Sequence, residues 1–356
     1  MIIYLIVEVL ILFLVFLFRG KQKKVYYELL ILLLCLMGLF RGQTVGTDVV
    51  AYSNNIRHTT FDSKTWNYET HFESGYNVLI ACYNVIGSSP LLFIGLCNVF
   101  FLLCWSHYNK IKCIKYDIGL MTLYMLGYYM QSYNIIRQYM ALGMMLLILS
   151  YYNVEKSKLR DDLLLLGAIL TIGLLFHNSC LLFIIILLYK LVRYSFVNTK
   201  WFYVGGIITS ALLFYSKIIR DLLGIYATGL FLLNEKSNTY FQHSLEGIAE
   251  EGEYSLYRML FDTMFLIFLI MRTSTMNIYV YMFFCAQLFM NLFAPLNTLF
   301  ARIPIVLVVA SIPLIVNIWS SKGRIDKTVI ILYFTIIFGN VLMKNYGDFQ
   351  PYVLNF

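Results

Sequence analysis

Long apolar stretches alternate with short polar segments along most of the chain. Charged or turn-forming residues bound each stretch, which is the pattern of helices that cross a bilayer. A helix needs about 20 residues to cross the hydrocarbon core, and somewhat shorter apolar cores flanked by polar residues still span it. The pattern predicts twelve spans, at 2–18, 25–40, 90–106, 118–131, 135–151, 162–177, 180–195, 201–216, 259–271, 277–294, 303–319 and 328–343.

Composition supports the same fold class. Of the 356 residues, 60% are apolar or aromatic and only 13% are charged, and the mean hydropathy is +0.73. Soluble domains are about 45–50% apolar and about 25% charged. We therefore expect one all-α polytopic membrane domain over 1–356, with about 12 transmembrane helices. A cytosolic enzyme and an ordinary nucleic-acid-binding protein are excluded.

The distribution of charge predicts the orientation. No Lys or Arg precedes the apolar residues 2–18, whereas a cationic cluster follows them, so we expect a retained first span and not a signal peptide. With both termini outside, 17 of the 27 Lys and Arg fall in short inside loops. Two long stretches, about 41–89 and 217–258, then face outward. Within the first, residues 75–87 are apolar but too short to span, which predicts an interfacial or re-entrant helix.

The second long stretch contains the most polar segment of the chain, residues 234–257. A solvated loop and a lid over an outward-facing site both fit this composition.

Three arginines lie near the predicted outer ends of spans. Arg41 follows the second span, Arg137 lies in a nearly charge-free run, and Arg302 opens the eleventh span. Charges this close to hydrocarbon usually face a partner or a wet cavity. Because a guanidinium binds phosphate in a two-pronged geometry, the three arginines fit a diphosphate at the membrane surface. Structural ion pairs with outer carboxylates are the alternative.

A polar face is predicted around the second of these arginines. Asn134, Arg137 and Gln138 have the i, i+3, i+4 spacing of one helical face, so we expect them to line a cavity.

Carboxylates and a histidine provide candidates for acid–base chemistry. Asp48 and Tyr52 are four residues apart, and Glu73 and Tyr76 are three apart, so each pair shares a face if its segment is helical. A carboxylate against an apolar surface can become a general base. His177 ends the sixth span and is a candidate base or phosphate contact, or a structural hydrogen-bonding group.

Other catalytic motifs do not occur in the sequence. It contains no P-loop, G-x-G-x-x-G, D-x-D, G-x-S-x-G or H-E-x-x-H, and its seven cysteines are scattered without metal-ligand spacing. We therefore expect no nucleotide site, no cofactor and no metal.

Five segments in order resemble the EpsG family of Wzy-type bacterial polysaccharide polymerases. They are RGQTVGTDVVAY (41–52), ESGYNVL (73–79), NIIRQYMA (134–141), LLFHNS (174–179) and FAR (300–302) before a proline. The resemblance thus covers the chain from about 41 to 302.

This resemblance implies a multi-pass enzyme of the bacterial inner membrane. Such a polymerase joins oligosaccharide repeat units carried on undecaprenyl diphosphate into O-antigen, capsule or exopolysaccharide on the outer face. Arg41, Arg137 and Arg302 would then bind the diphosphates, Asp48, Glu73 or His177 would contact the acceptor or act as base, and Tyr52, Tyr76, Asn134 and Gln138 would support the cavity. A flippase and a chain-length regulator are the expected partners besides membrane lipid.

Three other functions stay open at this point. An O-antigen ligase would use the same donor with another acceptor. A flippase or secondary transporter commonly has two related halves, whereas no internal repeat is found. A polysaccharide acyltransferase would centre on His177 and leave the arginines without a role.

Overall fold

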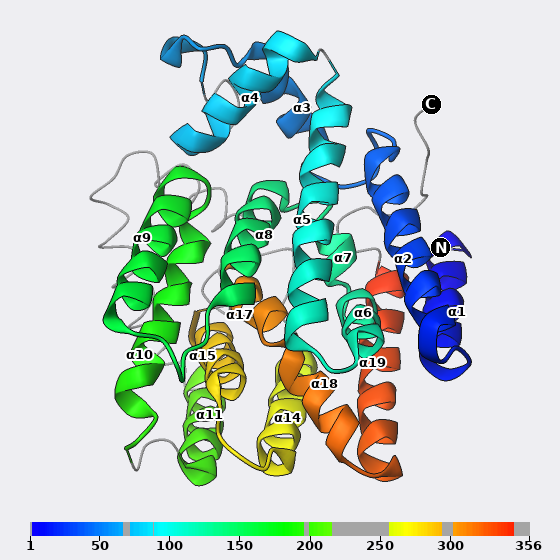
Figure 1. Ribbon diagram of the computed structural model, residues 1–356, viewed down its shortest axis with the longest axis vertical. Helices are drawn as coiled ribbons and strands as arrows, with labels where there is room; N and C mark the ends of the chain where they lie inside the picture. Colours follow the sequence, from blue (N-terminus) through cyan, green and yellow to red (C-terminus); the bar gives the residue numbers. More distant parts are fainter. Residues whose placement is uncertain are drawn as a thin grey trace. The chain divides into compact units, whose positions relative to one another are not determined.

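The computed structural model describes residues 2–66, 72–87, 89–195, 199–215, 256–293 and 302–344, and the elements in these ranges are helical (Figure 1). Contacts divide the chain into two compact units, Met1–Ile184 with Ile312–Phe356, and Ile185–Ser311. A single membrane domain over 1–356 stays a prediction. The second predicted outer loop, 217–258, lies outside the described residues except for its last three, which are helical, and both alternatives for its polar segment, a lid and a solvated loop, stay open.

The first unit contains most of the helices. They are α1 (Ile2–Phe16), α2 (Gly20–Leu39), α3 (Val49–His58), η1 (Ser63–Thr65), α4 (Ser74–Ile86), α5 (Pro90–Lys112), α6 (Tyr116–Met125), α7 (Tyr128–Gln131), α8 (Ile136–Tyr151), α9 (Leu159–Leu175), η2 (Asn178–Phe183), α18 (Ile312–Ser321) and α19 (Arg324–Lys344). The second unit contains α10 (Ile184–Val192), α11 (Lys200–Tyr215), α14 (Leu256–Arg272), α15 (Ile278–Phe293) and α17 (Ile305–Ala310). Within it α11, α14 and α15 contact one another.

Each of the twelve apolar stretches holds helix, which agrees with an α-helical membrane protein. Among the described helices, Pro90–Lys112 and Arg324–Met343 have by themselves the length and hydropathy to cross a membrane. The others are shorter or less apolar, so the number of twelve crossings stays a prediction.

Two stretches predicted as continuous helices are divided. The stretch 118–131 is interrupted at Gly127, whose φ of 77° is left-handed and ends α6. The stretch 303–319 is interrupted at Ser311, and Pro313, two residues later, lacks the N–H that would bond the Val309 carbonyl in a continuous helix.

Helix α5 is the central element of the first unit and contacts α2, α3 and α8. Small residues permit the close approach. A Cβ on Gly95 of α5 would lie 2.8 Å from the Cα of Leu39 in α2, and a Cβ on Gly143 of α8 would lie 3.1 Å from the Cα of Phe101 in α5. Such glycines let helix backbones pack closely where both sides are apolar and water supplies no driving force.

Helices α3 and α4 lie across the ends of α5, α8 and α9 (Figure 1). The Nδ2 of Asn84 in α4 donates to the carbonyls of Ile56 and Thr59 at 2.7 and 2.8 Å and so holds α3 against α4. The predicted short helix at 75–87 is confirmed as α4. Its length of 13 residues, about 20 Å, is too short to span, and its location at the membrane interface stays a prediction.

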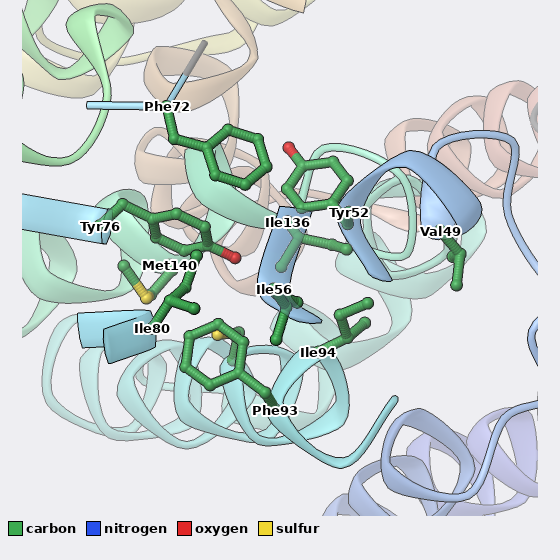
Figure 2. Close-up of a cluster of buried hydrophobic side chains, with 11 residues drawn as sticks. Val49, Tyr52, Ile56, Phe72, Tyr76, Ile80, Phe93, Ile94, Ile136 and Met140 are labelled. Carbon is green, nitrogen blue, oxygen red and sulfur yellow. The ribbon is translucent and has the colours of Figure 1, made fainter. Parts of the chain in front are cut away.

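A buried cluster fills the space between these short helices and the ends of α5 and α8 (Figure 2). Its members are Val49, Tyr52, Ile56, Phe72, Tyr76, Ile80, Phe93, Ile94, Cys97, Ile136 and Met140. Edge-to-face ring contacts link Phe72 to Tyr76 and Tyr76 to Phe93, at 5.3 and 5.8 Å between centroids. This cluster fixes α3 and α4 against the long helices, and two of its tyrosines belong to the candidate site.

Replacing Gly95 by Ala should destabilise the protein. The new Cβ would meet backbone atoms of Leu39, which cannot move aside as a side chain could, and overpacking of this kind costs about 1–3 kcal/mol. We expect a lower Tm for the purified protein in detergent. Gly167→Ala in α9 is the control, since nothing lies within 4 Å of its added methyl group and Ala favours helix. An equal or higher Tm for Gly95→Ala would contradict the packing described.

Candidate functional site

Arg137 lies in the first turn of α8 and joins three segments of the first unit. Its Nη1 donates to Oε2 of Glu73 at 2.5 Å, and its Nε donates to the hydroxyl of Tyr52 at 3.2 Å. Glu73 immediately precedes α4 and Tyr52 lies in α3. The structural ion pair considered as an alternative role for the arginines is therefore present at Arg137.

Aromatic rings hold the guanidinium in place. The Cζ of Arg137 lies 4.5 Å from the centroid of the Phe72 ring, within the range of a cation–π contact. The Phe72 ring in turn stacks on Tyr52, with centroids 5.1 Å apart and planes 28° apart (Figure 2). Phe72 was not among the residues predicted from the sequence. Its position directly before Glu73, in a motif segment, is the signal that could have identified it.

The ion pair is partly open to the surroundings. The side chains of Arg137 and Glu73 are 18% and 17% exposed. Two charges at this depth lose part of their hydration and are stabilised by each other. The guanidinium is therefore not fully enclosed by the protein.

Glycine 75 brings the start of α4 against the end of α9. A Cβ at this position would lie 2.7 Å from the carbonyl oxygen and 2.8 Å from the Cβ of Leu175, the last residue of α9. The Nδ2 of Asn77 donates to the carbonyl of Phe72 at 3.1 Å and fixes the backbone beside Glu73. These two contacts set where the carboxylate of Glu73 lies.

His177 lies beyond the last residue of α9, in the connection to η2. Its Nδ1 accepts the backbone N–H of Ser179 at 3.2 Å and lies 2.8 Å from the Ser179 hydroxyl. This places the proton of the neutral ring on Nε2. With Nδ1 occupied by Ser179, the ring offers Nε2–H as a hydrogen-bond donor and has no second nitrogen ready to accept a proton.

Asp48 and the two tyrosines complete the group. Asp48 precedes the first residue of α3, is partly exposed, and lies one turn before Tyr52, with which it interacts electrostatically. Burial raises the pKa of Tyr52, which stays protonated at neutral pH. Tyr76 is fully buried in the hydrophobic cluster between α3, α4 and the ends of α5 and α8. The helices assumed for the two pairs are present as α3 and α4, but Asp48 and Glu73 each precede the helix, and the backbone of Glu73 is extended, so neither pair lies wholly within a helix.

The predicted polar face around Arg137 is only partly present. Gln138 is in α8 and buried, but Asn134 precedes the helix, which begins at Ile136, so the expectation of three residues on one helical face is wrong for Asn134. Ile135, with φ −93° and ψ 53°, is not helical, and the residues before it form a turn that packs against Gly46. The φ of Gly46 is +113°, and a Cβ there would lie 2.5 Å from the Asn134 Oδ1 and 3.3 Å from the carbonyl of Tyr133.

Arg41 lies in the same unit but is 2% exposed. Its Cζ lies 4.5 Å from the ring centroid of Tyr133, one residue before Asn134. The segment from Arg41 to Gly46 thus packs against the turn that leads into α8.

Arg302 belongs to the second unit. It is exposed and precedes α17, and the other two residues of the FAR segment lie outside the described residues. Four of the five motif segments therefore come together in the first unit, around Arg137, Glu73, Tyr52 and His177. Within the described ranges, no three His, Cys, Asp or Glu side chains gather as ligands for a metal.

Comparison with known proteins gives one match. A family model described as the EpsG family matches residues 24–354. No curated protein and no solved structure matches the chain.

Replacing Gly75 by Ala should disturb this group of residues without removing any of them. The methyl group would push the start of α4 away from Leu175, and with it the carboxylate of Glu73. We expect the polysaccharide synthesis that the family match implies to fall severalfold, while the amount of protein in the membrane changes little. Ser74→Ala, an exposed neighbour on the same turn, is the control. Full activity in Gly75→Ala, with normal levels of protein, would contradict this account.

Proposed function

The chain belongs to the EpsG family, a family of Wzy-type polysaccharide polymerases and exopolysaccharide-biosynthesis proteins, and from this premise we propose that it polymerises lipid-linked repeat units. The substrates are oligosaccharides on undecaprenyl diphosphate at the outer face of the bacterial inner membrane. The product is O-antigen, capsular polysaccharide or exopolysaccharide.

One observation supports the proposal most directly. A partly exposed guanidinium is held by a carboxylate, a phenol and an aromatic ring from segments that are far apart in the sequence. A helix-packing role alone needs no charge at the edge of an apolar protein, where charges are costly. A substrate that carries a diphosphate at the membrane surface gives this arginine a function.

The reaction needs no nucleotide because the donor is already activated. A hydroxyl at the non-reducing end of the acceptor unit attacks the anomeric carbon of the growing glycan. The new glycosidic C–O bond forms as the bond from that carbon to the diphosphate oxygen breaks, and undecaprenyl diphosphate leaves with the electron pair. Arg137 stabilises the charge that develops on the leaving diphosphate. The Nε2–H of His177 donates a further hydrogen bond to it.

We assign the general base to Asp48. Glu73 is bound to Arg137, and the Nδ1 of His177 already accepts the backbone N–H of Ser179. Asp48 lies on the same side of α3 as Tyr52, which contacts Arg137. It would take the proton of the attacking hydroxyl.

The remaining candidates have supporting roles in this proposal. Arg41 and Asn134 hold the turn before α8, and Tyr76 and Gln138 support the site from the buried side. Arg302, in the second unit, is assigned to a second diphosphate. A flippase that delivers the units and a chain-length regulator are the expected partners.

Arg137→Lys should strongly reduce polymerisation. Lysine keeps the charge but loses the fork of donors, and a hydrogen bond to a charged group contributes about 1.5–3 kcal/mol, so turnover should fall by about tenfold to a hundredfold. The variant is expressed in a strain that lacks the gene, and the surface and lipid-linked glycans are resolved on a gel. The wild-type gene should restore the ladder, whereas the variant should leave mostly single repeat units.

Arg57→Lys is the matched control, because Arg57 is an exposed arginine of α3. A normal ladder in Arg137→Lys, at equal protein levels, would remove the arginine from the site. Full-length glycan that accumulates on the carrier in the deletion strain would indicate a ligase. Repeat units that stay on the cytoplasmic face would indicate a flippase.

Asp48→Asn should abolish most of the activity and leave the fold intact. Loss of a general base typically costs about 10²- to 10⁴-fold in rate, and Asp48 makes no side-chain cap bond to α3. The rate of glycan extension by purified protein on a lipid-linked repeat unit measures the effect. Asp62→Asn is the control, since Asp62 is exposed and Asn can cap η1 in its place. Extension within twofold of wild type would exclude Asp48 as the base.

A further inference from the structure

The ion pair at the centre of the site suggests a second role for its carboxylate. A diphosphate bound by Arg137 needs the same donor, Nη1, that Glu73 now occupies at 2.5 Å. Both ligands are anions, and one position on a guanidinium edge cannot serve both at full strength. Ligand and carboxylate therefore compete.

The carboxylate cannot move far from the arginine. The backbone just before Glu73 is fixed by the Asn77 side chain, which bonds the Phe72 carbonyl at 3.1 Å, and α4 is tied to α3 through Asn84. Gly75 packs against Leu175 on the other side. A displaced Glu73 carboxylate stays within a side-chain length of the bound diphosphate, and the two negative charges repel at partial burial.

This competition has a use in a polymerase that works repeatedly. The interactions that stabilise the leaving diphosphate also hold it after the bond has broken, so a site made only of cations would release its product slowly. A built-in carboxylate weakens the hold on the diphosphate and re-forms the ion pair as the product departs.

We propose that Glu73 is an internal competitor of the diphosphate: it holds Arg137 between turnovers and promotes release of undecaprenyl diphosphate. This inference rests on the proposed function. It assigns Glu73 to product release and not to proton abstraction from the acceptor.

The experiment compares diphosphate binding in full-length wild type, Glu73→Gln and Glu73→Asp, each in nanodiscs. Gln has the size of Glu without its charge, and Glu73 makes no cap hydrogen bond to α4, so the change tests the charge alone. The probe is farnesyl diphosphate, and farnesyl monophosphate and inorganic pyrophosphate serve as further ligands to separate the contributions of charge and lipid. We expect Glu73→Gln to bind farnesyl diphosphate about tenfold more tightly, mainly through slower dissociation. Glu73→Asp should lie between it and wild type.

The same proteins are then tested with a lipid-linked repeat unit. Glu73→Gln should still form first linkages in a burst and then slow, because release of the carrier limits turnover. Equal or weaker binding of farnesyl diphosphate by a folded Glu73→Gln variant would overturn the proposal. A loss of the first linkage itself would also overturn it, since Glu73 would then act in the chemical step.

Arg137→Lys in the binding assay keeps the two proposals apart. If wild type and Arg137→Lys bind farnesyl diphosphate equally, the assignment of the diphosphate to Arg137 fails, and the role of Glu73 fails with it. If Arg137→Lys binds more weakly and Glu73→Gln does not bind more tightly, only the competition is wrong.

Discussion

The ion pair between Arg137 and Glu73 connects segments that are 64 residues apart and that both contribute a neighbouring residue, Ile136 and Phe72, to the buried cluster. The two charges stabilise each other in a partly dehydrated place. The position of α4 and the start of α8 therefore depend on each other. Phe72 and Tyr52 limit the number of geometries that the pair can adopt.

Glycines make this arrangement possible where side chains would prevent it. Gly95 allows α5 to approach α2, Gly75 allows α4 to reach the end of α9, and Gly46 adopts a positive φ against the turn before α8. Each is a contact between backbones or with a backbone carbonyl, so the requirement is steric. In a protein whose helices gain little from hydrophobic burial against lipid, close packing of this kind provides much of the specificity.

The proposed chemistry follows from how the environment divides the tasks among similar groups. Two carboxylates precede short helices, but one is bound to an arginine and the other lies beside a tyrosine. The histidine accepts a backbone N–H at Nδ1 and is thus a donor at Nε2. The same residue types in other surroundings would have other roles, so residue type alone could not assign them.

The sequence by itself determined the all-helical class, nearly all of the helix positions and the family. Apolar runs and a low content of charge are sufficient for the first two, and five ordered segments for the third. It also selected Arg137, Glu73, Tyr52 and His177 as candidates, although it left open whether they meet. Only the tertiary structure brought these four together, added Phe72, and located Arg41 under Tyr133 and Asn134 outside α8. The physical reason is that helix formation depends on neighbours in sequence, whereas an ion pair or a close glycine contact depends on how distant helices pack.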